Sequence, residues 1–125
     1  MPALVGTVAV PARPRWTATG LRLERGGHYR LAAAGRWTDG FITCGPEGYE
    51  RALLAPLRRF RRAPGAPWFQ LMGALDADAA RPFPIGAGCT LSPAHDGELA
   101  CFANDLCVMA WNNRGAVTLQ VWRER

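Results

Sequence analysis

Three polar side chains near the C-terminal end of the chain have the chemistry to bind one metal ion. Asp105, which closes the apolar segment "ELACFAND", would supply a carboxylate, and Asn112 and Asn113 would each supply an amide oxygen. Backbone carbonyls in the loop between them would add further oxygens. Hard cations such as calcium accept roughly six to eight oxygens of these kinds together. With one carboxylate, such a shell would stay incomplete until another molecule contributed oxygens.

The same residues also suit an ordinary connecting turn. Asparagine and aspartate are favoured in turns because their side chains bond to nearby backbone without any metal. Gly115 follows closely and permits backbone geometry closed to other residues. The residues alone therefore leave a calcium site and a plain turn as alternatives.

The segments that must position these residues show the alternation of β-strands. Leu21 and Leu23 alternate with charged residues, and "AVTLQVW" near the C-terminus alternates in the same way. Glycine, proline, asparagine and aspartate separate such runs at short intervals. The expected strands are 4–10, 16–24, 28–35, 67–74, 82–91, 98–104 and 115–122, with a short additional one near 36–42. We therefore predict an all-β domain over 1–125, a small jelly-roll-like β-sandwich of about seven or eight antiparallel strands.

One segment competes with this pattern. Within 50–62, Leu53, Leu57 and Phe60 follow a helical spacing, but Pro56 interrupts the middle of the run. We expect a long excursion that contains at most a turn or two of helix.

Composition limits the class of protein. The chain has 125 residues, 49% of them apolar, which is typical of a globular protein. No apolar run approaches the ~20 residues that span a bilayer. The first residues lack a basic leader before their apolar run, which predicts no secretory signal and a cytoplasmic location as the simplest expectation.

The net charge is +5, and all fifteen basic residues are arginine. The densest cluster is "LRRFRRAPG", with four arginines around Phe60. Basic and aromatic residues together can bind nucleic acid. However, the cluster is a single one, it runs into Pro64-Gly65, and no nucleic-acid-binding signature accompanies it. We expect a solvated loop or a partner-facing patch, and no nucleic acid.

The cysteines and histidines suggest neither zinc nor catalysis. The four cysteines (Cys44, Cys89, Cys101 and Cys107) show no CxxC spacing and are expected to be small buried hydrophobes, with a disulfide only in an oxidising compartment. His95 lies beside Asp96 in "SPAHDG", but a turn explains these letters, and no nucleophile motif is present. We predict that the protein is not an enzyme.

Several segments resemble a known family. "FPIGAG", "DGELACFAND" and "NNRGAVTLQV" are similar to the PA-I-type galactophilic lectins of bacteria, small calcium-dependent, galactose-binding jelly rolls. In that family an Asn-Asn or Asp-Asn pair follows seven residues after a strand-closing Asp, and a Gly then opens the last strand. Asp105 and Asn112 keep this spacing. "RLAAAGRWTDG", "CGPEG" and "WFQLMGAL" extend the resemblance over most of the chain.

The resemblance implies a ligand set. Calcium would be held by the side chains of Asp105, Asn112 and Asn113, with backbone carbonyls near Met109 and Asp39. Two neighbouring hydroxyls of a galactose-type sugar would complete the coordination. Because the lectins of this family are oligomeric, a homo-oligomer is a further expectation.

The chain departs from the family in the loop 49–67. The histidine and glutamine that contact sugar in the family are missing there, and Glu50 and Arg51 are the substitutes that this chain offers. Trp111 could be a platform for the sugar or a core residue. The sequence thus predicts a calcium-dependent, galactose-type binding module. The alternative is a ligand-free structural or protein-interaction module with the same fold.

Overall fold

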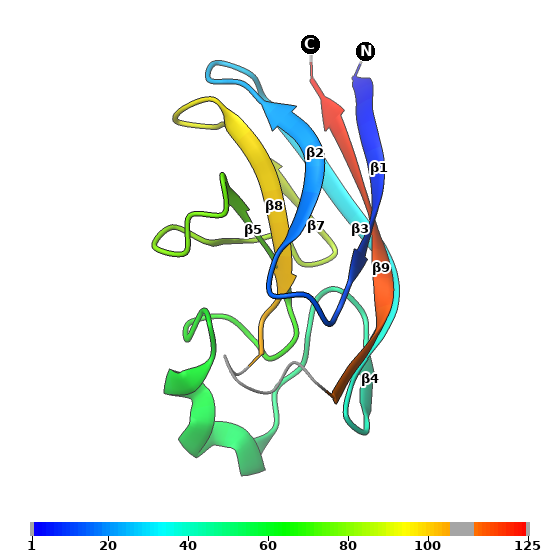
Figure 1. Ribbon diagram of the computed structural model, residues 1–125, viewed down its shortest axis with the longest axis vertical. Coiled ribbons are helices and arrows are strands. Elements are labelled where there is room, and N and C mark those ends of the chain that lie inside the picture. Colours follow the sequence, from blue (N-terminus) through cyan, green and yellow to red (C-terminus); the bar gives the residue numbers. More distant parts are fainter. Residues whose placement is uncertain (1, 106–111, 125) are drawn as a thin grey trace.

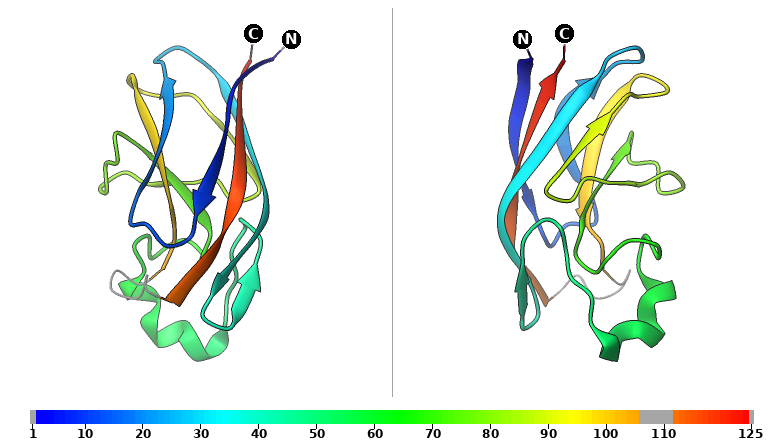
Figure 2. Two further views of the ribbon diagram at one scale, coloured as in Figure 1. Left: turned by 45° about the vertical axis from the view of Figure 1, so that its right-hand side comes forward. Right: turned by 180° about the vertical axis from the view of Figure 1, so that it is seen from behind.

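Two antiparallel sheets face each other in the computed structural model, which describes residues 2–105 and 112–124 (Figure 1, Figure 2). Within these residues, the first sheet has the order β1 (Ala3–Pro11), β9 (Asn113–Arg123), β3 (Tyr29–Asp39) and β4 (Ile42–Cys44), with β7 (Gly88–Leu91) also paired to β3. The second has the order β2 (Thr17–Leu23), β8 (Gly97–Ala103), β5 (Leu71–Leu75) and β6 (Phe83–Pro84). The predicted all-β sandwich is confirmed.

The alternation of side chains places the core between the sheets. On β9, Val117, Leu119 and Val121 are fully buried, while Thr118 and Gln120 between them are exposed. β3 pairs with β9 along its whole length, from Tyr29 to Asp39. Burial of one face of such strands is the main contribution to the stability of a sandwich.

Trp37 links the two sheets near the site end of the molecule. Its side chain is fully buried, and its indole Nε1 donates a hydrogen bond of 3.1 Å to the carbonyl of Phe69. The two rings pack edge to face with centroids 5.5 Å apart. A buried indole N–H needs such a partner, so this bond fixes the segment before β5 against β3.

Three predicted strand boundaries are wrong. The strands expected at 28–35 and 36–42 are mainly one strand, because the pairing of β3 with β9 continues to Asp39. The expected strand 82–91 divides into β6 and β7, separated by Gly86 at φ +58°. β5 begins only at Leu71, since Phe69 has the left-handed φ of 59° and cannot continue a strand.

The helix η1 (Ala52–Phe60) is longer than the turn or two that we predicted. It is a 3₁₀ helix of nine residues, about three turns, with Pro56 inside it. Proline removes a single backbone donor, and Pro56 itself is exposed. None of the helix residues is buried, so its chain loops outward from the sandwich (Figure 1). No helix in 2–105 and 112–124 is long and apolar enough to cross a membrane.

Candidate functional site

Strands from both sheets bring the predicted oxygen ligands to one end of the sandwich. Asp39 ends β3 and pairs with Asn113, the first residue of β9. The backbone N–H of Gly40 donates to the carbonyl of Asn112 at 3.2 Å. Asp105 follows β8 of the other sheet, and Asp39, Asp105 and Asn112 line one pocket. The sequence-predicted ligands Asp39, Asp105, Asn112 and Asn113 are therefore neighbours in the structure.

Two buried amide oxygens in this group have no protein partner among the described residues. Asn113 is 3% exposed, and its Nδ2 donates to the carbonyl of Ala12 at 3.1 Å, which leaves Oδ1 as the unused end of the amide. Oδ1 of Asn112 is likewise buried and receives no hydrogen bond from that part of the chain. A buried acceptor without a partner costs about 1–3 kcal/mol. A cation beside these oxygens would offset that cost.

Asp105 brings a carboxylate into the same region. The residue is 5% exposed, and its backbone carbonyl accepts a hydrogen bond of 3.1 Å from the N–H of Arg62. Its negative charge contributes to raising the pKa of Tyr49, which places the two side chains within electrostatic reach. The end of β8 thus aims a nearly buried acid at the pocket.

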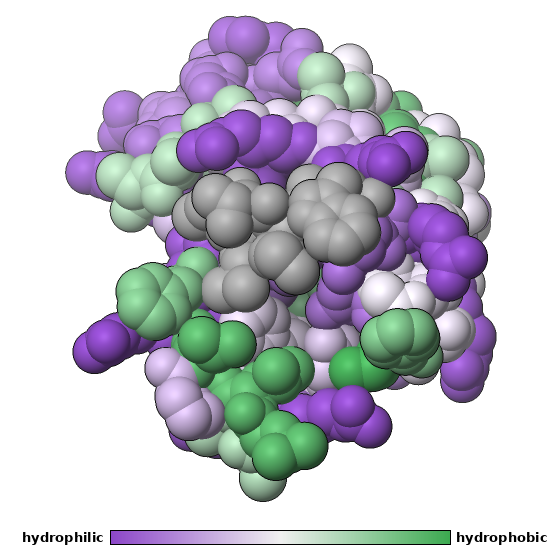
Figure 3. Space-filling view, turned by 60° about the horizontal axis from the view of Figure 1, so that its bottom comes forward, coloured by the Kyte–Doolittle hydropathy of each residue, from purple (hydrophilic) through white to green (hydrophobic). Residues whose placement is uncertain are grey.

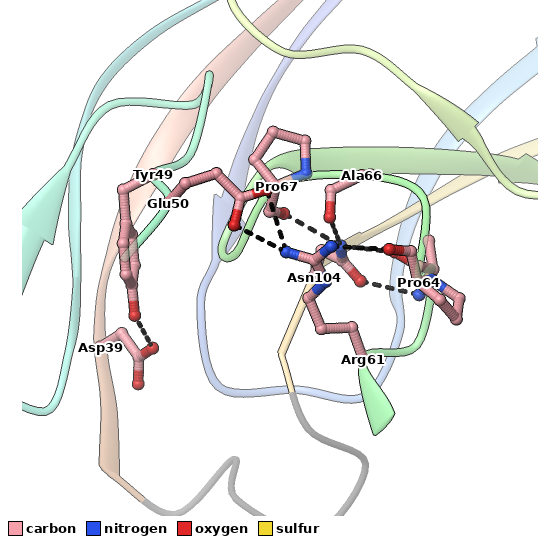
Figure 4. A network of polar contacts seen from close by, with 9 residues as sticks. Asp39, Tyr49, Glu50, Arg61, Pro64, Ala66, Pro67 and Asn104 are labelled. Atoms are coloured by element: carbon pink, nitrogen blue, oxygen red, sulfur yellow. Dashed lines mark hydrogen bonds and ion pairs between the residues drawn. The ribbon is translucent and has the colours of Figure 1, made fainter. Parts of the chain in front are cut away.

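Asp39 adds a second carboxylate, which is bonded to Tyr49 (Figure 4). The phenol hydroxyl donates to Oδ2 at 2.6 Å. Burial raises the pKa of Asp39, and the bond from Tyr49 lowers it in part. Burial, followed by the bond to Asp39, raises the pKa of Tyr49, so the phenol is a neutral donor. Such a poorly solvated carboxylate gains from a nearby cation.

The pocket is lined by both polar and apolar residues. Its volume is about 260 Å³, which suits a small molecule. Asp39, Asp105 and Asn112 supply the oxygens, and Tyr49 and Trp68 are among the aromatic residues that line the pocket. The remaining lining residues are Gly40, Phe41, Ile42, Arg51, Leu54 and Leu57.

The other predicted site residues do not all lie at the pocket. Arg51 lines the pocket, whereas Glu50 does not and instead accepts hydrogen bonds of 3.0 and 3.2 Å from Nη1 of Arg61. The role predicted for Glu50 as a sugar contact therefore competes with this ion pair. Met109 and Trp111 lie outside the described residues.

Tyr49 and Asn104 are site residues that the sequence did not single out as such. The Asn104 amide is fully buried and ties the turn at 63–67 to the end of β8 (Figure 4). Its Oδ1 accepts from the N–H of Ala63 at 2.8 Å, and its Nδ2 donates to the carbonyls of Ala63, Ala66 and Pro67 at 2.9–3.1 Å. A polar residue directly after the apolar run Leu99–Ala103 was the available signal. Asn104 thereby holds the backbone next to Asp105.

Two of the four arginines in the cluster, Arg61 and Arg62, pack against aromatic rings of the protein. Arg61 is 5% exposed, donates to the carbonyl of Pro64 at 2.6 Å, and stacks over Trp68 at 5.1 Å from the ring centroid. The guanidinium of Arg62 lies 3.7 Å from the ring centroid of Phe102. The expectation of a solvated or partner-facing loop is therefore wrong for Arg61, while Arg58 and Arg59 are exposed.

Comparisons with known proteins support the fold. No protein-family profile and no curated protein sequence matches the chain. Among solved structures, the chain is similar to the "EclA N-terminal domain; PllA-like lectin" with a TM-score of 0.76 and 22% sequence identity. The similarity covers 97% of this chain and 98% of that one. At this identity the likeness shows a shared β-sandwich fold.

Proposed function

We propose that the protein is a non-catalytic, calcium-dependent carbohydrate-binding module with a preference for galactose-type sugars. The observation that carries the proposal is the pair of buried amide oxygens of Asn112 and Asn113, which receive no hydrogen bond from the described part of the chain and lie beside the carboxylates of Asp39 and Asp105. Carboxylate and amide oxygens together are the ligands that calcium accepts. The fold shared with a lectin domain supports the same function.

The chemistry of the site favours a hydroxylated ligand. Calcium held by few charged side chains would keep coordination positions for outside oxygens, and neighbouring sugar hydroxyls are suitable donors. The ring of Tyr49 borders the same pocket and offers an apolar surface for the C–H face of a sugar. Such a shallow contact has modest affinity for one sugar, so multivalent display would increase binding.

A calcium titration tests the metal site. We expect calcium to raise the melting temperature of the chelator-treated protein, by the equivalent of about 2.7 kcal/mol at a hundred times the Kd. Asp105→Asn should abolish this shift while the far-ultraviolet circular dichroism stays that of the native protein. Galactose binding, followed by calorimetry, should require calcium and disappear in the same variant. Glu98→Gln, at the exposed position of β8, is the matched acidic control.

The second candidate is a module that keeps the fold without the ligand. It is favoured by the internal bonds that occupy Asp39 and Glu50, since Tyr49 and Arg61 already satisfy these carboxylates in part. This candidate predicts no change of melting temperature at millimolar calcium. An unchanged melting temperature would therefore reject the lectin function in favour of this alternative.

A further inference from the structure

Exposed apolar side chains gather at the end of the molecule that carries η1. Among the described residues, the exposed large apolar side chains are Leu4, Phe41, Leu53, Leu57 and Phe60. All except Leu4 belong to η1 or to the turn between β3 and β4. Figure 3 shows hydrophobic side chains gathered on this end of the molecule. We refer to Phe41, Leu53, Leu57 and Phe60 as the apolar tip. Scattered exposed apolar residues are ordinary, but a cluster of them marks an interaction surface.

Leu53 and Phe41 are the most exposed members of the tip. Leu53 is 87% exposed and Phe41 105%, so their side chains extend into solvent. Phe60 is 50% exposed, and none of the residues of η1 is buried. The sandwich therefore does not use this helix in its core.

Positive charge accompanies the apolar tip. Arg58 and Arg59 in the last turn of η1 are exposed, as is Arg51 before the helix, and η1 itself contains no acidic residue. Glu50, the nearest acid along the chain, is bonded to Arg61. The surface thus combines large apolar groups with Arg58 and Arg59, which form no ion pair within 2–105 and 112–124.

Charge complementarity selects the partner. A second copy packed symmetrically on the same surface would bring its arginines against these arginines, which is unfavourable. An anionic lipid surface meets both requirements: the apolar groups enter the acyl boundary, and guanidinium groups reach the phosphates while their stems cover apolar area.

We infer that the apolar tip docks on the surface of an anionic lipid bilayer. η1 lies in the headgroup region, with Leu53 and Phe60 inserted about 5–10 Å into the acyl boundary and Arg58 and Arg59 at the phosphates. The pocket with Asp39 and Asp105 adjoins this surface, because Phe41 and Leu57 belong to both. Docking is independent of calcium and sugar.

Sedimentation with sugar-free vesicles in a chelating buffer tests the inference. We expect binding to vesicles of phosphatidylcholine and phosphatidylglycerol in equal amounts, and none to phosphatidylcholine alone. The double variant L53S/F60S should bind at least tenfold more weakly, since two inserted groups are lost. R58Q/R59Q should bind about thirty-fold more weakly at low salt, roughly fivefold per arginine. Neither pair lines the pocket.

Leu4→Ser is the control, because Leu4 is 56% exposed on β1 at the opposite end and should leave binding unchanged (Figure 1). Circular dichroism verifies the fold of each variant. The inference is overturned if wild type does not bind anionic vesicles, or if L53S/F60S binds them as wild type does. It is also overturned if the tip instead mediates a dimer that L53S dissociates while vesicle binding is absent. If the wild-type protein bound vesicles but did not bind calcium, only the proposed sugar function would be rejected.

Discussion

Asp39 occupies a position where proton and metal ion would compete. Its carboxylate is half-buried, accepts a hydrogen bond from Tyr49 and lines the pocket together with Asp105. Burial raises its pKa, so in the metal-free protein it takes up a proton at a higher pH than an ordinary aspartate. Without calcium, its contribution to stability is present at low pH and is lost as the pH rises through the folded-state pKa. Bound calcium would instead favour the ionised carboxylate of Asp39.

The affinity for calcium should therefore fall early as the solution is acidified. We expect the midpoint of a calcium titration, followed by melting temperature, to move to higher calcium as the pH falls from neutral toward about 4. The decline should begin above the usual range for aspartate, because the pKa of Asp39 is raised.

The variant Asp39→Asn tests whether Asp39 is the group whose proton competes with calcium. The variant keeps the size of the side chain and removes the titrating charge, so it should bind calcium about tenfold more weakly at neutral pH and with a flatter pH dependence. If the variant retained the wild-type pH profile, the competing proton would belong to another group.

At the residue scale, the sequence predicted the oxygen donors and missed the groups that hold them. Asp105, Asn112 and Asn113 could be expected near one another because their spacing along the chain is short and resembles a known pattern, and their role as metal ligands stays a prediction. Tyr49 and Asn104 act through contacts with segments about 10 to 41 residues away, and no local pattern encodes such pairing. Glu50 is a predicted polar contact to sugar, but its partner Arg61 could be recognised only from the fold.

At the element scale, alternation predicted the strands that have one buried face. It failed where strands end for conformational reasons, as at Phe69 with its positive φ, or where a partner strand extends them, as β9 does for β3. η1 is longer than predicted because Pro56, which would break an α-helix, lies inside this 3₁₀ helix. Hydrophobic periodicity therefore predicts which face of a strand is buried, but it does not predict where the strand ends.

The turn before Tyr49 depends on Gly48. This glycine has φ +77°, and an added Cβ would lie 2.4 Å from the carbonyl oxygen of Trp68. The same carbonyl accepts the N–H of Tyr49 at 2.8 Å, which joins the turn to the segment before β5. Gly48→Ala should lower the free energy of unfolding by about 2–4 kcal/mol through backbone strain and the forced separation. Urea denaturation measures this loss.

Gly65→Ala is the matched control for that substitution. Gly65 has no positive φ and no atom within 4 Å of an added Cβ. Alanine there should be neutral or stabilise by about 0.4–1 kcal/mol, through the lower entropy of the unfolded chain. Equal effects of the two substitutions would contradict the role of Gly48.

At the scale of the whole molecule, the termini and the site lie at opposite ends. The start of β1 and the end of β9 lie together at one end of the sandwich, and η1 and β4 lie at the other end (Figure 1). The core between the sheets, which includes Val10, Leu99 and Val121, separates the two regions. A ligand in the pocket and a surface under η1 would therefore be reached from the same side of the molecule.

The integrity of this core can be followed through the cysteine thiols. Cys101 on β8 is fully buried, and burial, with a smaller effect of Cys89, raises its pKa to about 12. Because alkylation requires an exposed thiolate, Cys101 should react with iodoacetamide only when the sandwich opens. Its labelling rate, measured by peptide mass spectrometry over a urea series, should rise about fivefold for each 1 kcal/mol by which urea lowers the free energy of unfolding.

Cys89 on β7 provides the internal reference in the same samples. It is half-buried, and burial also raises its pKa, but partial exposure should let it react faster than Cys101 in the absence of urea. As urea approaches the unfolding midpoint, the two rates should converge because both thiols become exposed in the unfolded chain. Equal rates in water would show instead that β8 separates from the opposing sheet without global unfolding, and would contradict a core shared by both sheets.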